Sequence, residues 1–102
     1  ELEQFINGKL KYFKKIMNID FKTFSIKSYK RRLGSCSYDK KLTFNWRIVM
    51  LPTKTIEYII VHELCHLIHF NHSKEFWTLV ENFSPDFREH KLLIKRNKDL
   101  FI

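Results

Sequence analysis

Four of the five histidines in the chain and one glutamate lie within the segment HELCHLIHFNH, at residues 62–72. His62 and His66 are four positions apart. In a helix both project from one face, about one turn apart, and can bind the same tetrahedral metal ion. Glu63, beside the first histidine, can then reach a water molecule at that ion. This HExxH spacing predicts a zinc site that hydrolyses amide bonds.

A catalytic zinc ion needs a third protein ligand and one open position. His72 is the first candidate, because Asn71 is a plausible helix stop after which the chain can turn back toward the ion. His69 lies on nearly the same face as His62, but roughly 10 Å further along a continuous helix. We therefore expect His69 to line the cleft. Three downstream carboxylates remain alternative third ligands: Glu75, Glu81 and Glu89.

The helix expected to position these groups spans residues 55–70. It is apolar nearly all round, and neither Lys nor Arg occurs between Lys54 and Lys74. Such a helix is typically buried, which places its histidines and glutamate inside the protein or at the floor of a cleft. Buried ionisable groups need partners or a metal. Cys65 lies off the histidine face, so we expect a small core residue there.

Other elements must surround this helix. Apolar residues recur at helical spacing over residues 2–17 and predict an amphipathic helix. Two β-rich runs, 24–29 and 42–51, are expected to pair as a hairpin across a long loop, and a bend could divide the second run in two. Turn residues occupy 34–41. Cap signals at Ser73 and at Ser84-Pro85 start two more helices, which we expect to span residues 73–83 and 86–99.

The order of these elements is helix, strands, then three helices, which predicts an α+β fold. We expect a small antiparallel or mixed sheet of about three strands, packed on the HExxH helix and the flanking helices. The 102 residues suffice for a single domain. No Met opens the chain, so residues 1–102 are expected to be a fragment of a longer protein.

The charge balance limits the classes of partner. Nineteen basic and 11 acidic residues give a net charge of +8, which favours nucleic acid or acidic peptides as partners, or simply keeps the domain soluble.

Two cysteines are too few for a disulfide framework. The charged amino end is unlike a signal peptide, and no apolar run is long enough for a membrane span. We therefore expect a cytoplasmic protein without a membrane partner.

Two longer segments, HELCHLIHFNHSKEFW (62–77) and RRLGSCSYDKKLTFNWRIVMLP (31–52), together resemble the YgjP-like family of predicted zinc metallopeptidases. These are relatives of the SprT-like and other zincin peptidases. In that family an R-x-G-S-C-S segment and an F-N-W-R strand precede a HELxH helix and an N-H-S-x-x-F-W segment. PDFREHK, which begins at Pro85, is similar to the family's tail. The resemblance covers most of the chain and implies a zincin-like minimal catalytic domain.

The resemblance also assigns roles. It implies that Glu63 is the catalytic base and that zinc is bound by His62, His66 and His72. It places four residues in the sheet that borders the substrate cleft: Gly34, Ser35, Cys36 and Ser37. Leu33 stands where the family typically has Trp, and Leu92-Leu93 replaces a more aromatic tail, so the cleft wall is expected to differ. Apart from the resemblance, a second donor is expected to stabilise the developing oxyanion, and the sequence offers four candidates without preferring one: Tyr38, Arg47, Arg88 and His90.

Three functions compete. In a zinc-dependent peptidase, the metal activates water and polarises the substrate carbonyl, while Glu63 carries the proton to the leaving amine. The +8 charge and the SprT-like relationship suggest, alternatively, a protease that acts on DNA-bound proteins. The third reading is a non-enzymatic, basic nucleic-acid-binding module with a structural zinc. Structural zinc sites usually have four protein ligands, so three histidines beside a glutamate favour a peptidase with a Zn²⁺ cofactor.

Overall fold

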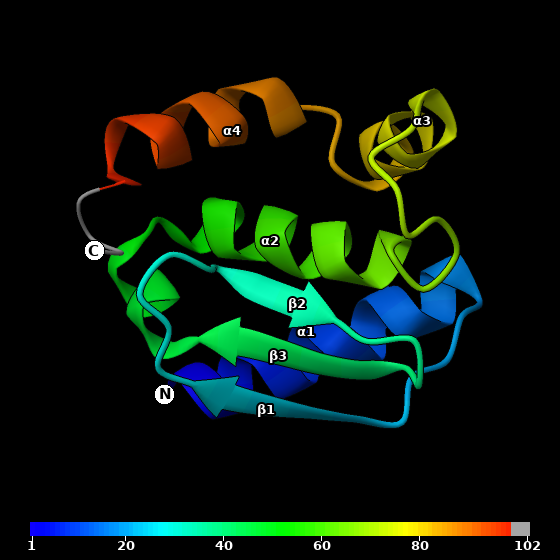
Figure 1. Cartoon of the computed structure of the whole chain (residues 1–102), viewed down its shortest axis with the longest axis horizontal. Helices are drawn as coiled ribbons and strands as arrows, with labels where there is room; N and C mark the ends of the chain where they lie inside the picture. The colour runs from blue at the N-terminus through cyan, green and yellow to red at the C-terminus, as the bar shows by residue number, and fades with distance from the viewer. Residues whose placement is uncertain (99–102) are drawn as a thin grey trace.

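The computed structural model describes residues 1–98 and confirms the α+β fold (Figure 1). One helix is followed by three short strands, a 3₁₀ helix and three further α-helices. Their bounds are α1 Leu2–Met17, β1 Thr23–Lys27, β2 Gly34–Cys36, β3 Lys41–Asn45, η1 Trp46–Met50, α2 Thr53–Cys65, α3 Lys74–Phe83 and α4 Phe87–Arg96. The first helix has the predicted bounds and ends at Asn18, whose left-handed backbone (φ 54°) terminates it.

The three strands form one mixed sheet in the order β1-β3-β2. β1 pairs in parallel with β3, with Phe24 opposite Leu42 and Ile26 opposite Phe44. β2 pairs antiparallel with the other side of β3 and is therefore an edge strand. The prediction that 24–29 and 42–51 form a hairpin is thus wrong. The hairpin joins β2 to β3 instead, and β2 lies within the segment expected to be a turn.

The second β-rich run is shorter than predicted, because β3 ends at Asn45 and residues 46–50 form the 3₁₀ helix η1. The buried side chain of Asn45 donates hydrogen bonds to the carbonyl oxygens of Tyr29 and Arg32, at 3.1 and 2.7 Å. Its side-chain oxygen accepts a bond from the Arg47 N–H at 3.0 Å, which caps the first turn of η1. These bonds direct the chain out of the sheet.

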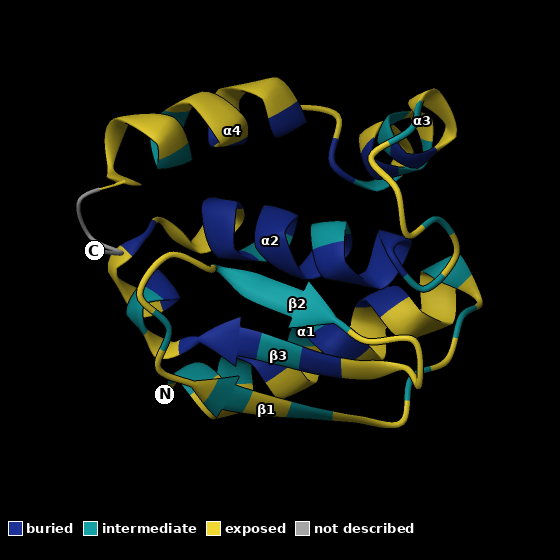
Figure 2. Cartoon of the chain, in the orientation of Figure 1, coloured by how far each residue is buried: buried dark blue, intermediate teal, exposed yellow. Residues whose placement is uncertain are grey.

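The core lies between the sheet and the helices α1 and α2. Leu42 and Phe44 of β3 are fully buried and pack with Ile6 and Leu10 of α1. Figure 2 shows that α2 is the most buried helix, enclosed by the sheet, α1 and α4. The prediction of a buried HExxH helix is confirmed, since most α2 residues between Thr55 and Cys65 are buried.

The predicted length of this helix is wrong: α2 ends at Cys65, not near residue 70. The next three backbone N–H groups bond three residues back, from His66 to Glu63, Leu67 to Leu64 and Ile68 to Cys65, which tightens the helix end into a 3₁₀ turn. Asn71 therefore lies in the following loop and terminates no helix.

The last two helices, α3 and α4, pack against the side of α2 that faces away from the sheet (Figure 1). α3 starts at its predicted cap, where the Ser73 hydroxyl accepts a bond from the Phe76 N–H at 3.3 Å. α4 ends at Arg96, so the predicted continuation is wrong for residues 97 and 98, and Asp99 lies outside the described residues. Within residues 1–98, no helix combines the length and apolar character that crossing a bilayer requires.

Candidate active site

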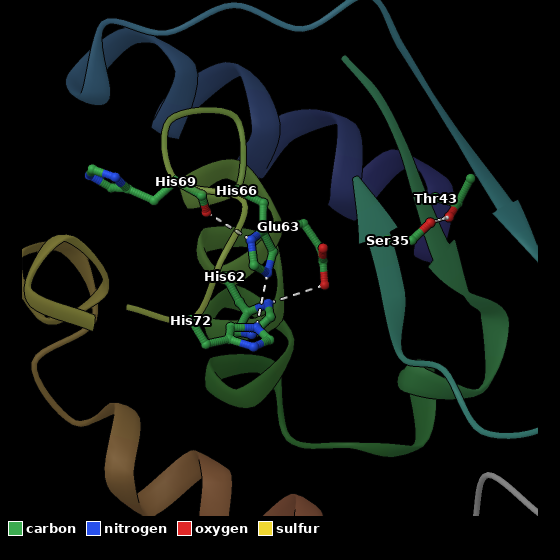
Figure 3. Close-up of polar contacts among 7 residues, drawn as sticks. All are labelled: Ser35, Thr43, His62, Glu63, His66, His69 and His72. Atoms are coloured by element: carbon green, nitrogen blue, oxygen red, sulfur yellow. Dashed lines mark hydrogen bonds and ion pairs between the residues drawn. The ribbon is translucent and has the colours of Figure 1, made fainter. Parts of the chain in front are cut away.

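Three histidines meet at the carboxyl end of α2. His62 lies on the helix, His66 follows its last residue, and His72 lies in the loop before α3. One ring nitrogen from each lies within 4.8 Å of the others, and the Nε2 atoms of His66 and His72 are 3.1 Å apart (Figure 3). Zn–N bonds of about 2.1 Å would separate tetrahedral ligand atoms by about 3.4 Å. The cluster therefore has the dimensions of a metal site.

Hydrogen bonds fix how two of these rings present their nitrogens. His66 Nδ1 lies 3.0 Å from the His69 carbonyl oxygen, which can only accept, so Nδ1 carries the proton. His62 Nδ1 lies 3.2 Å from Glu63 Oε2 and likewise donates to it. Each neutral ring then keeps a lone pair on Nε2, the tautomer that a metal needs. In the absence of a metal, His72 Nε2–H donates to His66 Nε2, and to bind a metal through Nε2 the neutral His72 ring would carry its proton on Nδ1 instead.

His69 has a different role from its neighbours. Figure 3 shows its ring pointing away from the cluster, while its backbone carbonyl faces His66. Because α2 ends at Cys65, the expected 10 Å offset along a continuous helix does not apply. His69 still contributes to the site, as a backbone acceptor that orients the His66 ring.

Two aromatic residues of α3 hold the histidine cluster in place, and sequence reasoning gave neither of them a role. Phe76 is fully buried and its ring centroid lies 5.1, 4.4 and 5.0 Å from those of His62, His66 and His72. Trp77 stacks on His72, with centroids 5.8 Å apart. The N-H-S-x-x-F-W motif thus places one ligand and its aromatic support within six residues.

The surroundings favour neutral imidazoles. Burial lowers the pKa of His66, although the His69 carbonyl and the Glu63 carboxylate partly oppose this shift. Desolvation also lowers the pKa of His72, and the neighbouring His62 and His66 lower it further. Since a protonated imidazole cannot bind a metal, both shifts extend metal binding toward lower pH. The donor set therefore fits a divalent metal ion.

Glu63 faces the cluster from the sheet side and is 5% exposed. It lies against β2: a Cβ atom built on Gly34 would be 3.2 Å from Glu63 Cγ and 3.4 Å from Oε2. Burial, assisted by the Glu63 charge, raises the thiol pKa of Cys36 to about 11 and that of Cys65 to about 12. Both thiols therefore stay protonated, and Cys65 is fully buried in the core, as expected.

The four residues expected beside the cleft have different environments. Gly34 lines a pocket together with His62 and Glu63. The Ser35 hydroxyl is bonded to Thr43 Oγ1 at 2.5 Å, away from the histidines (Figure 3). Ser37 lies in the β2–β3 turn and bonds Asp39 and Lys41. The sheet position is as expected for Gly34–Cys36, and their contact with substrate stays a prediction.

Among the described residues, the alternative ligands are not part of the metal-binding group, and each candidate oxyanion donor has another contact. In that part of the chain, the side chains close enough to share one metal ion are the three histidines, and the group includes none of Glu75, Glu81 and Glu89. Arg88 pairs with Glu81 and Arg47 lies over Trp46. Tyr38 is 85% exposed, and its ring contacts that of Phe70. His90 is buried, bonded to Thr55 and Asp86.

Tyr58, which sequence reasoning missed, lies between His90 and the metal cluster. Its ring stacks on His90, with centroids 5.7 Å apart, and meets the edge of His62 at 5.9 Å. Burial, with a smaller contribution from Glu63, raises the pKa of its hydroxyl. It is therefore a neutral phenol in the wall of the pocket that holds His62 and Glu63. Its place four residues before His62, on the same helix face, was the available signal.

Comparison with known proteins agrees with this geometry. Residues 1–97 match the model of the YgjP-like metallopeptidase domain. The crystal structure of the metallopeptidase zymogen of Pyrococcus abyssi abylysin is 26% identical, covers 89% of this chain and 90% of that chain, and has a TM-score of 0.75. The metallopeptidase zymogen of Methanocaldococcus jannaschii jannalysin is 26% identical, with 90% and 95% covered and a TM-score of 0.78. A search of curated proteins finds no match.

These comparisons exclude one of the three competing functions. A non-enzymatic nucleic-acid-binding module is the wrong reading, because the family match and both similar structures are metallopeptidases. The histidine triad supplies the metal-binding site that such an enzyme needs, and peptide bonds of proteins are its substrates. The chain therefore belongs to the YgjP-like family and is a metallopeptidase domain.

Proposed function

We propose that the domain is a zinc peptidase in which Glu63 is the general base and β2 borders the bound substrate. Three histidine ligands with an open position are the donor set of catalytic zinc sites, which supports zinc as the metal. When bound at His62, His66 and His72, zinc supplies Lewis-acid activation of water and of the substrate carbonyl. Other divalent metals also bind imidazole, so zinc is the proposal to be tested.

The position of Glu63 carries the proposal. The carboxylate is buried, lies next to the histidine cluster and is held by His62 Nδ1 at 3.2 Å. It can take a proton from the attacking water and deliver it to the amine that leaves. Gly34 leaves room for it, since any side chain there would meet Glu63.

The free edge of β2 is the proposed docking site for the peptide. In the part of the chain that the structure describes, its one strand partner is β3, so its other side can accept an extended chain through backbone hydrogen bonds. The edge comprises Gly34, Ser35 and Cys36, with Ser37 following in the turn. A peptide bound there passes beside Glu63. This arrangement requires no particular substrate side chain, so side-chain preference must come from neighbouring pockets.

Metal content and turnover of matched variants test the proposal. We expect one zinc per wild-type chain by native mass spectrometry, and none in His62→Ala. Glu63→Gln should retain zinc but lose at least roughly a hundredfold in kcat, the scale of general-base catalysis. Glu57→Gln is the control, because this residue of α2 pairs with Lys9 instead. A wild-type protein that binds no zinc would overturn the choice of zinc as the metal, and wild-type turnover by Glu63→Gln would overturn the role of Glu63.

The other alternative has less support. A protease that acts on DNA-bound proteins rests on the +8 charge and on the SprT-like relationship, and the comparisons add no support for nucleic-acid binding. The protein substrate is sufficient to account for the site.

A further inference from the structure

A pocket of about 370 Å³ adjoins the metal cluster, between α2, α4 and the connection from β1 to β2. Its lining includes His62, Glu63 and Gly34, which places it directly beside the reacting groups. A substrate residue next to the cleaved bond would therefore project into it. Its chemistry should decide which residue the enzyme accepts at that position.

The rim of this pocket is strongly basic. Lys91 and Lys95 lie one turn apart on α4, and Arg31 approaches from the connection before β2. Within the described part of the chain, Glu63 is the one acidic residue that lines the pocket. Among residues 1–98 none of the three cations forms an ion pair. Lys91 Nζ lies 4.1 Å from the Trp77 ring centroid.

The remainder of the pocket is apolar. Leu33, Ile59, Ile94 and the Tyr58 ring supply this part of the lining. An apolar wall with cations at the rim suits a short aliphatic stem that ends in a carboxylate. Lys91 and Lys95 also line the adjoining groove between α3 and α4, together with Lys74 and Arg88. Glu81 in the same groove pairs with Arg88, so the positive charge that continues beyond the pocket comes from Lys74, Lys91 and Lys95.

We propose that Arg31, Lys91 and Lys95 select a carboxylate group of the peptide substrate, next to the bond that is cleaved. The carboxylate is either an Asp or Glu side chain or the carboxyl terminus of the peptide. The inference rests on the proposed peptidase function, since it assigns a specificity pocket to the same site. It also gives the basic surface a function that requires no nucleic acid.

Paired peptides test the preference. Each peptide places Glu, Gln or Lys in turn on either side of one cleavable bond, and carries either a free or an amidated carboxyl terminus. We expect kcat/KM to be roughly tenfold higher with Glu than with Gln at one position, and lowest with Lys, with a difference that shrinks at high salt. If kcat/KM rises only for the peptides with a free carboxyl terminus, the pocket binds the terminal carboxylate. Equal rates for all peptides would overturn the proposal.

Variants identify the side chains responsible. Lys95→Gln and Arg31→Gln should each reduce the Glu-to-Gln ratio about threefold, the scale of one exposed ion pair. Lys95→Glu should move the preference toward Lys peptides. Lys11→Gln on α1 is the matched control, because Lys11 is exposed and lies outside the pocket lining. Each variant is also assayed for zinc content. Variants that bind zinc and hydrolyse peptides with an unchanged Glu-to-Gln ratio would refute the specificity pocket alone. A wild-type protein that neither binds zinc nor hydrolyses any peptide would instead refute the proposed zinc-peptidase function.

Discussion

Replacing Gly34 by Ala would test how closely β2 fits the proposed base. The new Cβ would lie 2.8 Å from the Thr43 carbonyl oxygen, about half an ångström inside ordinary contact, and 3.2 Å from Glu63 Cγ. No glycine here has a positive φ, so alanine can adopt this backbone and the effect isolates the contact. Relieving the clash with Thr43 means moving β2 away from β3.

The expected cost has two parts. Overpacking of this kind destabilises by about 1–3 kcal/mol. A shift of Glu63 by a few tenths of an ångström should lower kcat roughly tenfold, because misplacement by 1 Å at a reacting group can cost about a hundredfold. The three atoms nearest to the new Cβ belong to Thr43 and Glu63 and to no histidine, so zinc content should be unchanged. Urea unfolding, metal analysis and steady-state hydrolysis of one peptide measure the three quantities.

Gly8→Ala is the matched control for this substitution. Gly8 lies inside α1, and a Cβ there would meet nothing within 4 Å. Alanine should therefore stabilise the helix by about 0.5–1 kcal/mol and leave hydrolysis unchanged. If Gly34→Ala behaved like Gly8→Ala in both stability and kcat, the proposed contact between β2 and the catalytic carboxylate would be refuted.

Phe76→Leu should cost about 1–2 kcal/mol of stability and weaken zinc binding roughly tenfold in a chelator competition, because Phe76 contacts all three histidine rings. If the variant bound zinc as tightly as the wild type, Phe76 would not support the histidine rings. Lowering the pH should destabilise the metal-free domain. Burial lowers the pKa of His66 and His72 below 6.5, so the unfolded chain takes up protons first and stability falls as pH drops through 6.5. Urea unfolding at about pH 7.5 and about pH 5.5 should show a larger loss in the wild type than in His66→Gln/His72→Gln, and equal losses would contradict it.

The local part of the site could be predicted from the sequence. The spacing of His62 and His66 fixes their common face through the period of the α-helix alone. The position of His72 was expected for the wrong reason, since the helix stops at Cys65 and not at Asn71. Apolar spacing in 73–83 indicated a helix but could not show that Phe76 supports the histidine rings.

The tertiary part could not be predicted. A strand's alternation fixes which face is buried but not which strand lies beside it, so nothing in FSIKSY (24–29) indicated a parallel partner. The end of β3 depends on bonds from Asn45 to Tyr29 and Arg32, which are distant in sequence. The cytoplasmic location and the longer parent chain stay predictions.

The mixed sheet implies an order of folding. The β2–β3 hairpin pairs near neighbours, from Cys36 with Leu42 outward, whereas β1 pairs Thr23 with Lys41 across the whole of β2. Closing the longer loop costs more entropy before any contact compensates for it, so β1 is expected to dock after the hairpin has formed. The strand nearest Glu63 would then be assembled early. Weakening β1 should speed unfolding more than it slows folding.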